Sequence, residues 1–184
     1  MKRLQRRATD SALHPFLYPT ESFYALGVKA TNRLAVEQLF RIKQREPGKP
    51  IALIAANLQQ VRKFFIMSKT EERLARQFWP GSLTMLLKPK RTIQSIALGA
   101  KKIGVRVPAH VGARRIAARA AAPITATSAN ISGRPPTKSA RKLKHDFPDI
   151  LIMPGRCGRQ TKPSTIINVQ GSTITIIRQG SVRV

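Results

Sequence analysis

The sequence predicts one α/β domain with a mixed sheet, extending over residues 1–184. Apolar segments of strand length alternate with helical patterns in the early part of the chain, as in α/β folds. A β-hairpin pattern follows near the end, and hairpins add antiparallel pairs to a sheet. With 184 residues, 42% of them hydrophobic, the chain can bury one core.

The first half of the chain alternates strands with helices that have recognisable caps. Strands are expected over 13–18, 51–56 and 82–88, and helices over 33–43, 57–64 and 68–78. Thr31 or Asn32 can cap the first helix and Asn57 the second, because short polar side chains accept from free N–H groups at a helix start. Ser68 and Glu71 have the spacing of a capping box for the third. The inner side of the first helix should carry Leu34, Val36, Leu39 and Phe40.

The second half of the chain contains shorter elements. We expect strands over 103–107 and 124–127, a helix over 112–121 rich in alanine and arginine, and a hairpin pairing 164–169 with 173–178. Thr137 can cap a basic helix that continues to about residue 144. Residues 22–27 are small and aromatic, so we expect them to pack against the sheet.

The composition is strongly basic, and it excludes several kinds of chemistry. The 34 Lys and Arg against 8 Asp and Glu give a net charge of +26, which favours a polyanionic partner. The single cysteine excludes an internal disulfide, and His14, His110 and His145 lack metal-ligand spacing, so no protein metal site is expected. No P-loop motif, membrane-spanning run or secretory signal is present, which indicates a soluble cytoplasmic protein without membrane partners.

A basic stretch follows the first helix. Lys43, Arg45 and Lys49 gather where that helix gives way to the next strand. Pro47 and Pro50 forbid a continuous helix there, because proline lacks the backbone donor and clashes with the preceding turn. A rigid loop that holds three cations at a sheet end is a candidate anion site, and a solvated surface is the alternative.

Other polar side chains stand at the expected strand ends, where ligands of open α/β sheets usually bind. They are Thr20 with Glu21, Arg106, Ser128 with Asn130, Ser164 with Thr165, and Arg178. The set supplies fixed cations together with hydroxyl and amide donors, and it contains almost no acid or base. Such a site suits a phosphate-bearing substrate whose reaction needs positioning and charge stabilisation more than proton transfer.

Taken together, these motifs resemble the YrdC-like family of threonylcarbamoyladenylate synthases, in its short, single-domain form. The matching motifs are Pro19-Thr20-Glu21 with Tyr24 and Gly27, Lys43-x-Arg45 with Lys49-Pro50, Trp79-Pro80-Gly81, Gly104-Val105-Arg106-Val107-Pro108, Thr127-Ser128-Ala129-Asn130 with Ser132-Gly133, Pro163-Ser164-Thr165, and Arg178 with Gly180. They occur in the family's order from about residue 17 to the end. The resemblance implies a twisted, open mixed sheet with flanking helices and a concave basic groove.

The resemblance also implies a reaction and a set of site residues. L-threonine, bicarbonate and ATP would give threonylcarbamoyl-AMP and pyrophosphate, and a partner complex would move the threonylcarbamoyl group to adenosine 37 of tRNA. The matched catalytic positions are Lys43, Arg45, Ser128 and Asn130. Thr20, Arg106 and Lys49 match substrate-binding positions, and Ser164 and Arg178 match nucleotide-binding positions. Mg²⁺ would be held mainly by the ATP phosphates, since the chain offers few carboxylates.

Three positions depart from the family pattern. Ala25 stands where glycine is common, Glu46 where proline is common, and Asn168 where aspartate is frequent. Glu46 could pair with Arg45 or Lys49 and reduce the charge of the site.

Two alternatives to the synthase remain at this point. One is an RNA-binding module of the same fold, for double-stranded RNA or tRNA, without strong catalysis; the high charge favours it, and an aromatic content of only 5% opposes it. The other is the carbamoyl-adenylating domain of hydrogenase-maturation proteins, which are much longer chains. Separately from the small-molecule site, two basic helix faces could bind tRNA or another polyanion, and a solvated surface is the alternative; their residues are Arg114, Arg115, Arg119, Lys138, Arg141, Lys142 and Lys144.

Overall fold

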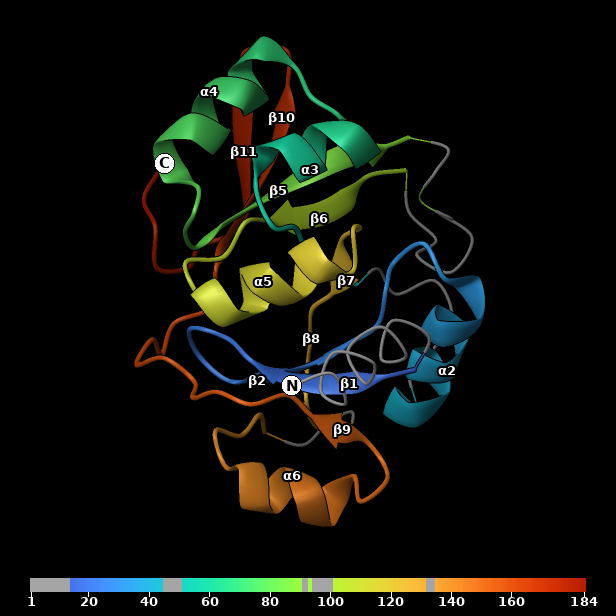
Figure 1. Cartoon of the computed structure of the whole chain (residues 1–184). Helices are drawn as coiled ribbons and strands as arrows, with labels where there is room; N and C mark the ends of the chain where they lie inside the picture. The colour runs from blue at the N-terminus through green and yellow to red at the C-terminus, as the bar shows by residue number, and fades with distance from the viewer. Residues whose placement is uncertain (1–13, 45–50, 91–92, 94–100, 132–134) are drawn as a thin grey trace.

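The computed structural model describes residues 14–44, 51–90, 93, 101–131 and 135–184, and these form two sheets with helices around them (Figure 1). In the described residues the smaller sheet has the order β8 (Thr127–Ser128), β2 (Tyr24–Gly27), β1 (Phe16–Pro19) and β9 (Leu151–Ile152). The larger sheet has the order β11 (Thr173–Arg178), β10 (Thr165–Gln170), β5 (Leu83–Pro89), β6 (Ile103–Arg106), β3 (Leu53–Ile54) and β7 (Ile124–Thr125), and β4 (Phe65–Ile66) pairs with β5. Both contain parallel and antiparallel pairs, so the expected α/β class with mixed pairing is confirmed.

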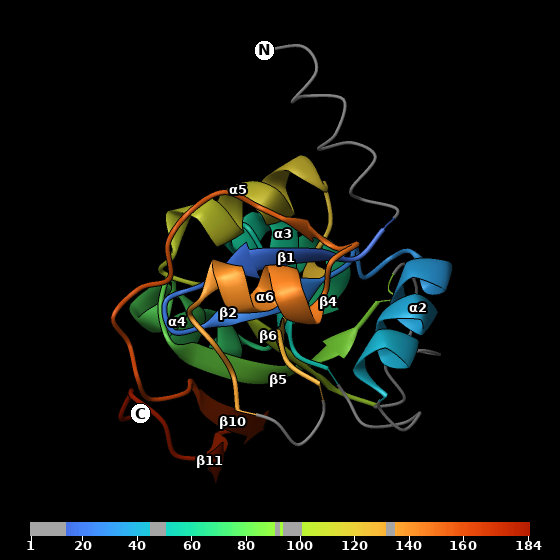
Figure 2. The ribbon, with the colours of Figure 1, turned by 90° about the horizontal axis from the view of Figure 1, so that it is seen from below.

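The helices cover the sheets from several sides (Figures 1 and 2). They are α2 (Arg33–Lys43), α3 (Leu58–Phe64), α4 (Lys69–Phe78), α5 (Val111–Arg119) and α6 (Ala140–Asp146). Ala113 and Ala117 of α5 are fully buried in one cluster with Tyr18 of the smaller sheet and Ile54 of the larger sheet. The small side chains of α5 therefore let this helix join the two sheets. None of the helices in the described residues is long and apolar enough to cross a membrane.

The helix starts follow the expected local chemistry in three cases. Asn32 accepts from the Ala35 N–H at 3.1 Å, and Asn57 accepts from the Gln60 N–H at 2.8 Å. Ser68 opens α4 with a complete capping box. One inner-face assignment is wrong: Leu34 is 74% exposed, because it lies on the solvent side of α2 while Val36, Leu39 and Phe40 pack inward.

Two further expectations need correction. Ser139, rather than Thr137, caps α6 by accepting from the Lys142 N–H, and the Thr137 hydroxyl accepts from the Ser139 N–H one step earlier. The expected strand over 124–127 is divided, since β7 pairs with β3 in the larger sheet while β8 pairs with β2 in the smaller one. Between them Ala126 donates its N–H to the Ala52 carbonyl at 2.8 Å. The chain thus passes from one sheet to the other at Ala126.

The C-terminal hairpin is confirmed, with Val169 opposite Ile174 and Gln170 opposite Thr173. Residues 24–27, expected only as a packed segment, form the central strand β2, and the short strands β4 and β9 were not expected. The apolar run over 51–56 is buried as expected for most of its length, although only Leu53–Ile54 is assigned as a strand. The apolar pattern therefore predicted where strands occur more accurately than it predicted how long they are.

Candidate functional site

A cavity of about 480 Å³ opens where the two sheets meet. Five of the side chains predicted from the sequence line it: Thr20, Arg106, Ser128, Ser164 and Arg178. Each stands at or next to a strand end, because Thr20 follows β1, Ser164 precedes β10, and the others are the last residues of β6, β8 and β11. Segments from Thr20 to Arg178 in the sequence thus contribute polar groups to one cavity.

Lys43 stabilises the backbone next to this cavity and is not among the residues that line it. It is the last residue of α2 and is buried, and its ammonium donates to the Ser128 carbonyl at 2.6 Å and to the Asn130 carbonyl at 2.9 Å. It also donates to Asn130 Oδ1 at 2.8 Å, and the Ser128 hydroxyl donates to the same oxygen at 2.6 Å. Three of the predicted catalytic residues therefore form one hydrogen-bonded unit.

For Lys43 alone, the structure differs from the expected loop that presents cations to a ligand. Lys43 belongs to a helix end and is directed into the protein, against carbonyl oxygens of the turn that follows β8. Arg45, Glu46 and Lys49 lie outside the described residues, so their predicted roles stay predictions. Gln44, which precedes them, closes α2 in the left-handed conformation with φ of 49°.

Thr20 combines a turn role with a place in the cavity wall. Its hydroxyl donates to the Phe23 carbonyl at 2.7 Å and accepts from the Ser22 N–H at 3.3 Å. Both contacts stabilise the turn between β1 and β2. This turn also fixes one edge of the cavity, which Ser22 and Phe23 line together with Thr20.

Ser164 and Arg178 are held together on the opposite side. Arg178 donates through Nη2 to the Ser164 carbonyl at 2.9 Å and to the Ser164 hydroxyl at 3.3 Å. Partial burial lowers the pKa of Arg178 below its usual value, and the positive charge of Arg106 lowers it further. Both guanidinium groups line the same cavity, and two like charges there favour an anion between them.

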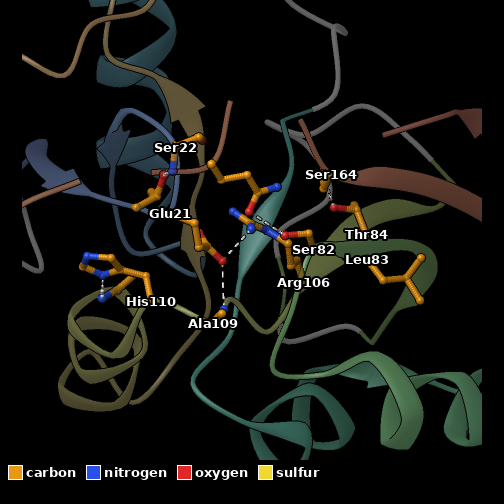
Figure 3. Close-up of polar contacts among 12 residues, drawn as sticks. Glu21, Ser22, Ser82, Leu83, Thr84, Arg106, Ala109, His110 and Ser164 are labelled. Atoms are coloured by element: carbon orange, nitrogen blue, oxygen red, sulfur yellow. Dashed lines mark hydrogen bonds and ion pairs between the residues drawn. The ribbon is translucent and has the colours of Figure 1, made fainter. Parts of the chain in front are cut away.

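Thr84 was missed by the sequence analysis. It is buried on β5, and its hydroxyl lies 2.8 Å from the Ser164 hydroxyl (Figure 3). A hydroxyl within the otherwise apolar run of β5 was the available signal, since a buried polar group requires a partner. Glu21 was noted only as a neighbour of Thr20, yet it binds Arg106 directly.

The departures from the family pattern have different locations. Ala25 lies on β2 opposite Ser128 and lines the cavity, so its methyl group reduces the space that glycine would leave. Asn168 accepts from the Lys102 ammonium at 2.7 Å on β10 and is not among the residues that line this cavity. With the aspartate that is frequent at that position, this contact would be an ion pair. The departure therefore changes a contact at the larger sheet and leaves the cavity lining unchanged.

The chain belongs to the Sua5/YciO/YrdC family, whose model, described as "Telomere recombination", matches residues 14–180. The Chromobacterium violaceum threonylcarbamoyl-AMP synthase is 36% identical over 178 residues, which is 94% of this chain and 92% of that protein. Among solved structures, Sua5 of P. abyssi complexed with L-threonine has a TM-score of 0.87 and 30% identity, over 96% of this chain and 54% of Sua5. E. coli YciO has a TM-score of 0.81 and 26% identity, over 98% of this chain and 90% of YciO. The chain thus spans nearly the whole of the synthase and about half the length of Sua5.

Proposed function

We propose that this protein is an L-threonylcarbamoyladenylate synthase, which makes threonylcarbamoyl-AMP and pyrophosphate from L-threonine, bicarbonate and ATP. The observation that carries the proposal is the shared cavity, which Arg106 and Arg178 line together with Thr20, Ser128 and Ser164. Family membership and the 36% identical synthase, matched over 92% of its length, support this reading over an RNA-binding module. The 36% identity to a threonylcarbamoyl-AMP synthase also favours this reading over the carbamoyl-adenylating domain of hydrogenase-maturation proteins.

The residues suit a reaction that depends on positioning. A carboxylate formed on the threonine nitrogen must attack the α-phosphate of ATP while pyrophosphate leaves. Arginine side chains hold phosphate oxygens through two parallel N–H groups and offset the charge that develops as pyrophosphate departs. We assign this task to Arg178, next to Ser164, and to Arg45. We assign Arg106 and Thr20, which line the same cavity, to binding the amino-acid substrate.

Lys43 and Asn130 have a supporting task in this proposal. Together they fix the turn that carries Ser128, whose hydroxyl stands at the cavity. Lys49 lies outside the described residues, so its substrate-binding role stays a prediction. Mg²⁺ would bind chiefly through the ATP phosphates, because hard anionic oxygens suit it and Glu21 beside the cavity is already bound by Arg106.

The product would serve tRNA modification in the cytoplasm, with partner proteins that move the threonylcarbamoyl group to adenosine 37. We also propose a tRNA contact through the basic surface of α5, where Arg115 and Arg119 are exposed and one turn apart. The α6 face suits this role less well. Lys138 precedes the helix and lies over the Phe23 ring, and Lys142 pairs with Asp146 at 2.8 Å.

A pyrophosphate-release assay tests the activity. With ATP, L-threonine and bicarbonate together the protein should release pyrophosphate, and omission of either threonine or bicarbonate should abolish the signal. Equal release without threonine, or none with all three substrates, would contradict the proposal. Replacement of L-threonine by L-valine, which has a methyl group in place of the hydroxyl, serves as the matched substrate control.

A further inference from the structure

Glu21 forms a largely buried ion pair with Arg106, one of the arginines found to line the cavity. Its Oε1 accepts from Arg106 Nη1 at 2.9 Å and from the Ala109 N–H at 2.8 Å (Figure 3). The two side chains are only 10% and 15% exposed, so the ion pair is largely removed from water. We propose that Glu21 is the positioning residue of Arg106, which it aims into the cavity. This inference rests on the proposed function and deepens it.

The pair is poorly arranged if its purpose is stability alone. One carboxylate oxygen receives both donors, while Oε2 is buried and has no hydrogen-bond partner in the described part of the chain. A buried charged oxygen without a partner costs free energy, and a buried ion pair adds little net stability even when both partners are well placed. The benefit of Glu21 is therefore expected where its partner Arg106 acts, which is at the cavity.

The direction of the contact explains the benefit. In the described contacts Glu21 occupies the Nη1 side of Arg106, and a guanidinium has five N–H donors in a fixed plane. Holding one edge of that plane leaves the other edge for an anionic group of the substrate. The carboxylate also offsets the charge of Arg106, which would otherwise repel Arg178 in the same cavity. Two guanidinium groups can thus share the cavity before an anion binds.

The backbone of Glu21 is itself held in place. Its carbonyl accepts from the Gln160 N–H at 3.1 Å, and the Thr20 carbonyl accepts from the Gly158 N–H at 2.9 Å. A Cβ atom on Gly158 would lie 2.5 Å from the Glu21 carbonyl oxygen, so only glycine permits this close approach. The segment around 158–160 therefore locks Glu21 over the end of β6, and this fixed position is what a positioning residue requires.

A double-mutant cycle with Glu21→Gln and Arg106→Gln tests the inference. Glu21→Gln keeps the size and an acceptor oxygen but removes the charge. Glu21→Ala removes the charge, the acceptor oxygens and most of the side chain. We expect kcat/KM in the pyrophosphate assay to fall about tenfold in Glu21→Gln and about 100-fold in Glu21→Ala, as for a misplaced substrate-binding group. Because Glu21 acts through Arg106, the double variant should be no slower than Arg106→Gln alone.

Glu71→Gln is the matched control. Glu71 is also a buried carboxylate, and it accepts from the Ser68 N–H at 2.6 Å in the cap of α4, among residues that do not line the cavity. This variant should keep kcat/KM within about twofold of the wild type. Gln retains the acceptor oxygen of the cap, so Tm should fall only through the lost carboxylate charge in the first turn of α4. Glu71→Gln thereby separates lost stability from lost positioning, and Glu21→Gln keeps the test usable if Glu21→Ala fails to fold.

The inference is overturned if Glu21→Gln retains wild-type kcat/KM, or if the losses in Glu21→Gln and Arg106→Gln multiply in the double variant. A second readout, the Kd of L-threonine by calorimetry, keeps it separate from the proposed activity. If the wild type binds L-threonine but releases no pyrophosphate, the proposed function fails, and the cycle is read in L-threonine affinity. Coupled losses of affinity then support the positioning role, whereas unchanged or independent affinities, or no L-threonine binding at all, overturn it.

Discussion

Replacing Lys43 by methionine should destabilise the protein, although a lysine beside a basic loop would ordinarily be dispensable. The side chain is 3% exposed, and its ammonium donates to Ser128 and Asn130 over 2.6–2.9 Å. Methionine can fill the space of the aliphatic stem, but it offers no donor to these oxygens. The loss is therefore one of hydrogen bonding and charge more than one of packing.

The magnitude follows from the contacts. Each hydrogen bond from a charged donor contributes about 1.5–3 kcal/mol, so three would suggest at least roughly 4.5 kcal/mol. The variant no longer has to bury an ammonium group, which offsets part of that sum. We therefore expect a loss of about 3 kcal/mol, which corresponds to a decrease in Tm of roughly 6–12 °C for a domain of this size.

Thermal unfolding followed by circular dichroism measures this effect. Arg41→Met is the matched control, because Arg41 lies on the exposed side of the same helix and should contribute little. Folded Lys43→Met should also show reduced pyrophosphate release, since the turn that carries Ser128 loses its support. A Tm within about 2 °C of the wild type would refute the idea that the Lys43 contacts stabilise the domain.

Three further predictions concern the site and the surface. Arg45→Ala should cost on the order of 2–4 kcal/mol of transition-state stabilisation with almost no change in Tm, and near-normal kinetics would assign Arg45 to a solvated surface. Thr84→Val removes the hydroxyl next to Ser164 at nearly constant shape, so the Kd of ATP should rise about 2- to 10-fold by calorimetry; an unchanged Kd would contradict this. Replacing Arg115 and Arg119 by alanine should reduce the slope of tRNA affinity against salt concentration by roughly 1–2 in a log–log plot. A salt-independent affinity of the wild type would reject phosphate contacts.

Local chemistry explains which parts of the fold were predictable. The caps of α2, α3 and α4 depend on side chains three residues from the N–H groups that they accept from, so Asn32, Asn57 and Ser68 were recognisable in the sequence. The cap of α6 was misplaced because Thr137 and Ser139 are both good cap residues only two positions apart. The division of β7 from β8 was not predictable, since it depends on which distant strands pair with each half.

The same distinction applies to the site. Strand ends and family motifs indicated five side chains that line one cavity, because strand ends in α/β sheets bring distant residues together. The sequence did not indicate that Lys43 points inward or that Glu21 binds Arg106. In each of these contacts the partners are 85 residues apart, so neither spacing nor composition relates them. Such pairings become visible only when the packing of α2 and the turn after β1 is known.

The position of the cavity follows from the passage of the chain between the two sheets. Because β7 belongs to the larger sheet and β8 to the smaller one, the segment through Ala126 brings Ser128 beside β2. Arg106 ends β6, which β3 separates from β7 in the larger sheet. Side chains at strand ends of both sheets then line one cavity. In a single continuous sheet, the next strand would occupy that space. Lys43 holds the turn after β8, and Glu21 holds Arg106, so a buried charged contact supports each side of this opening. Lys43 and Glu21 are thus charges that the fold buries at some cost and that keep the cavity in shape.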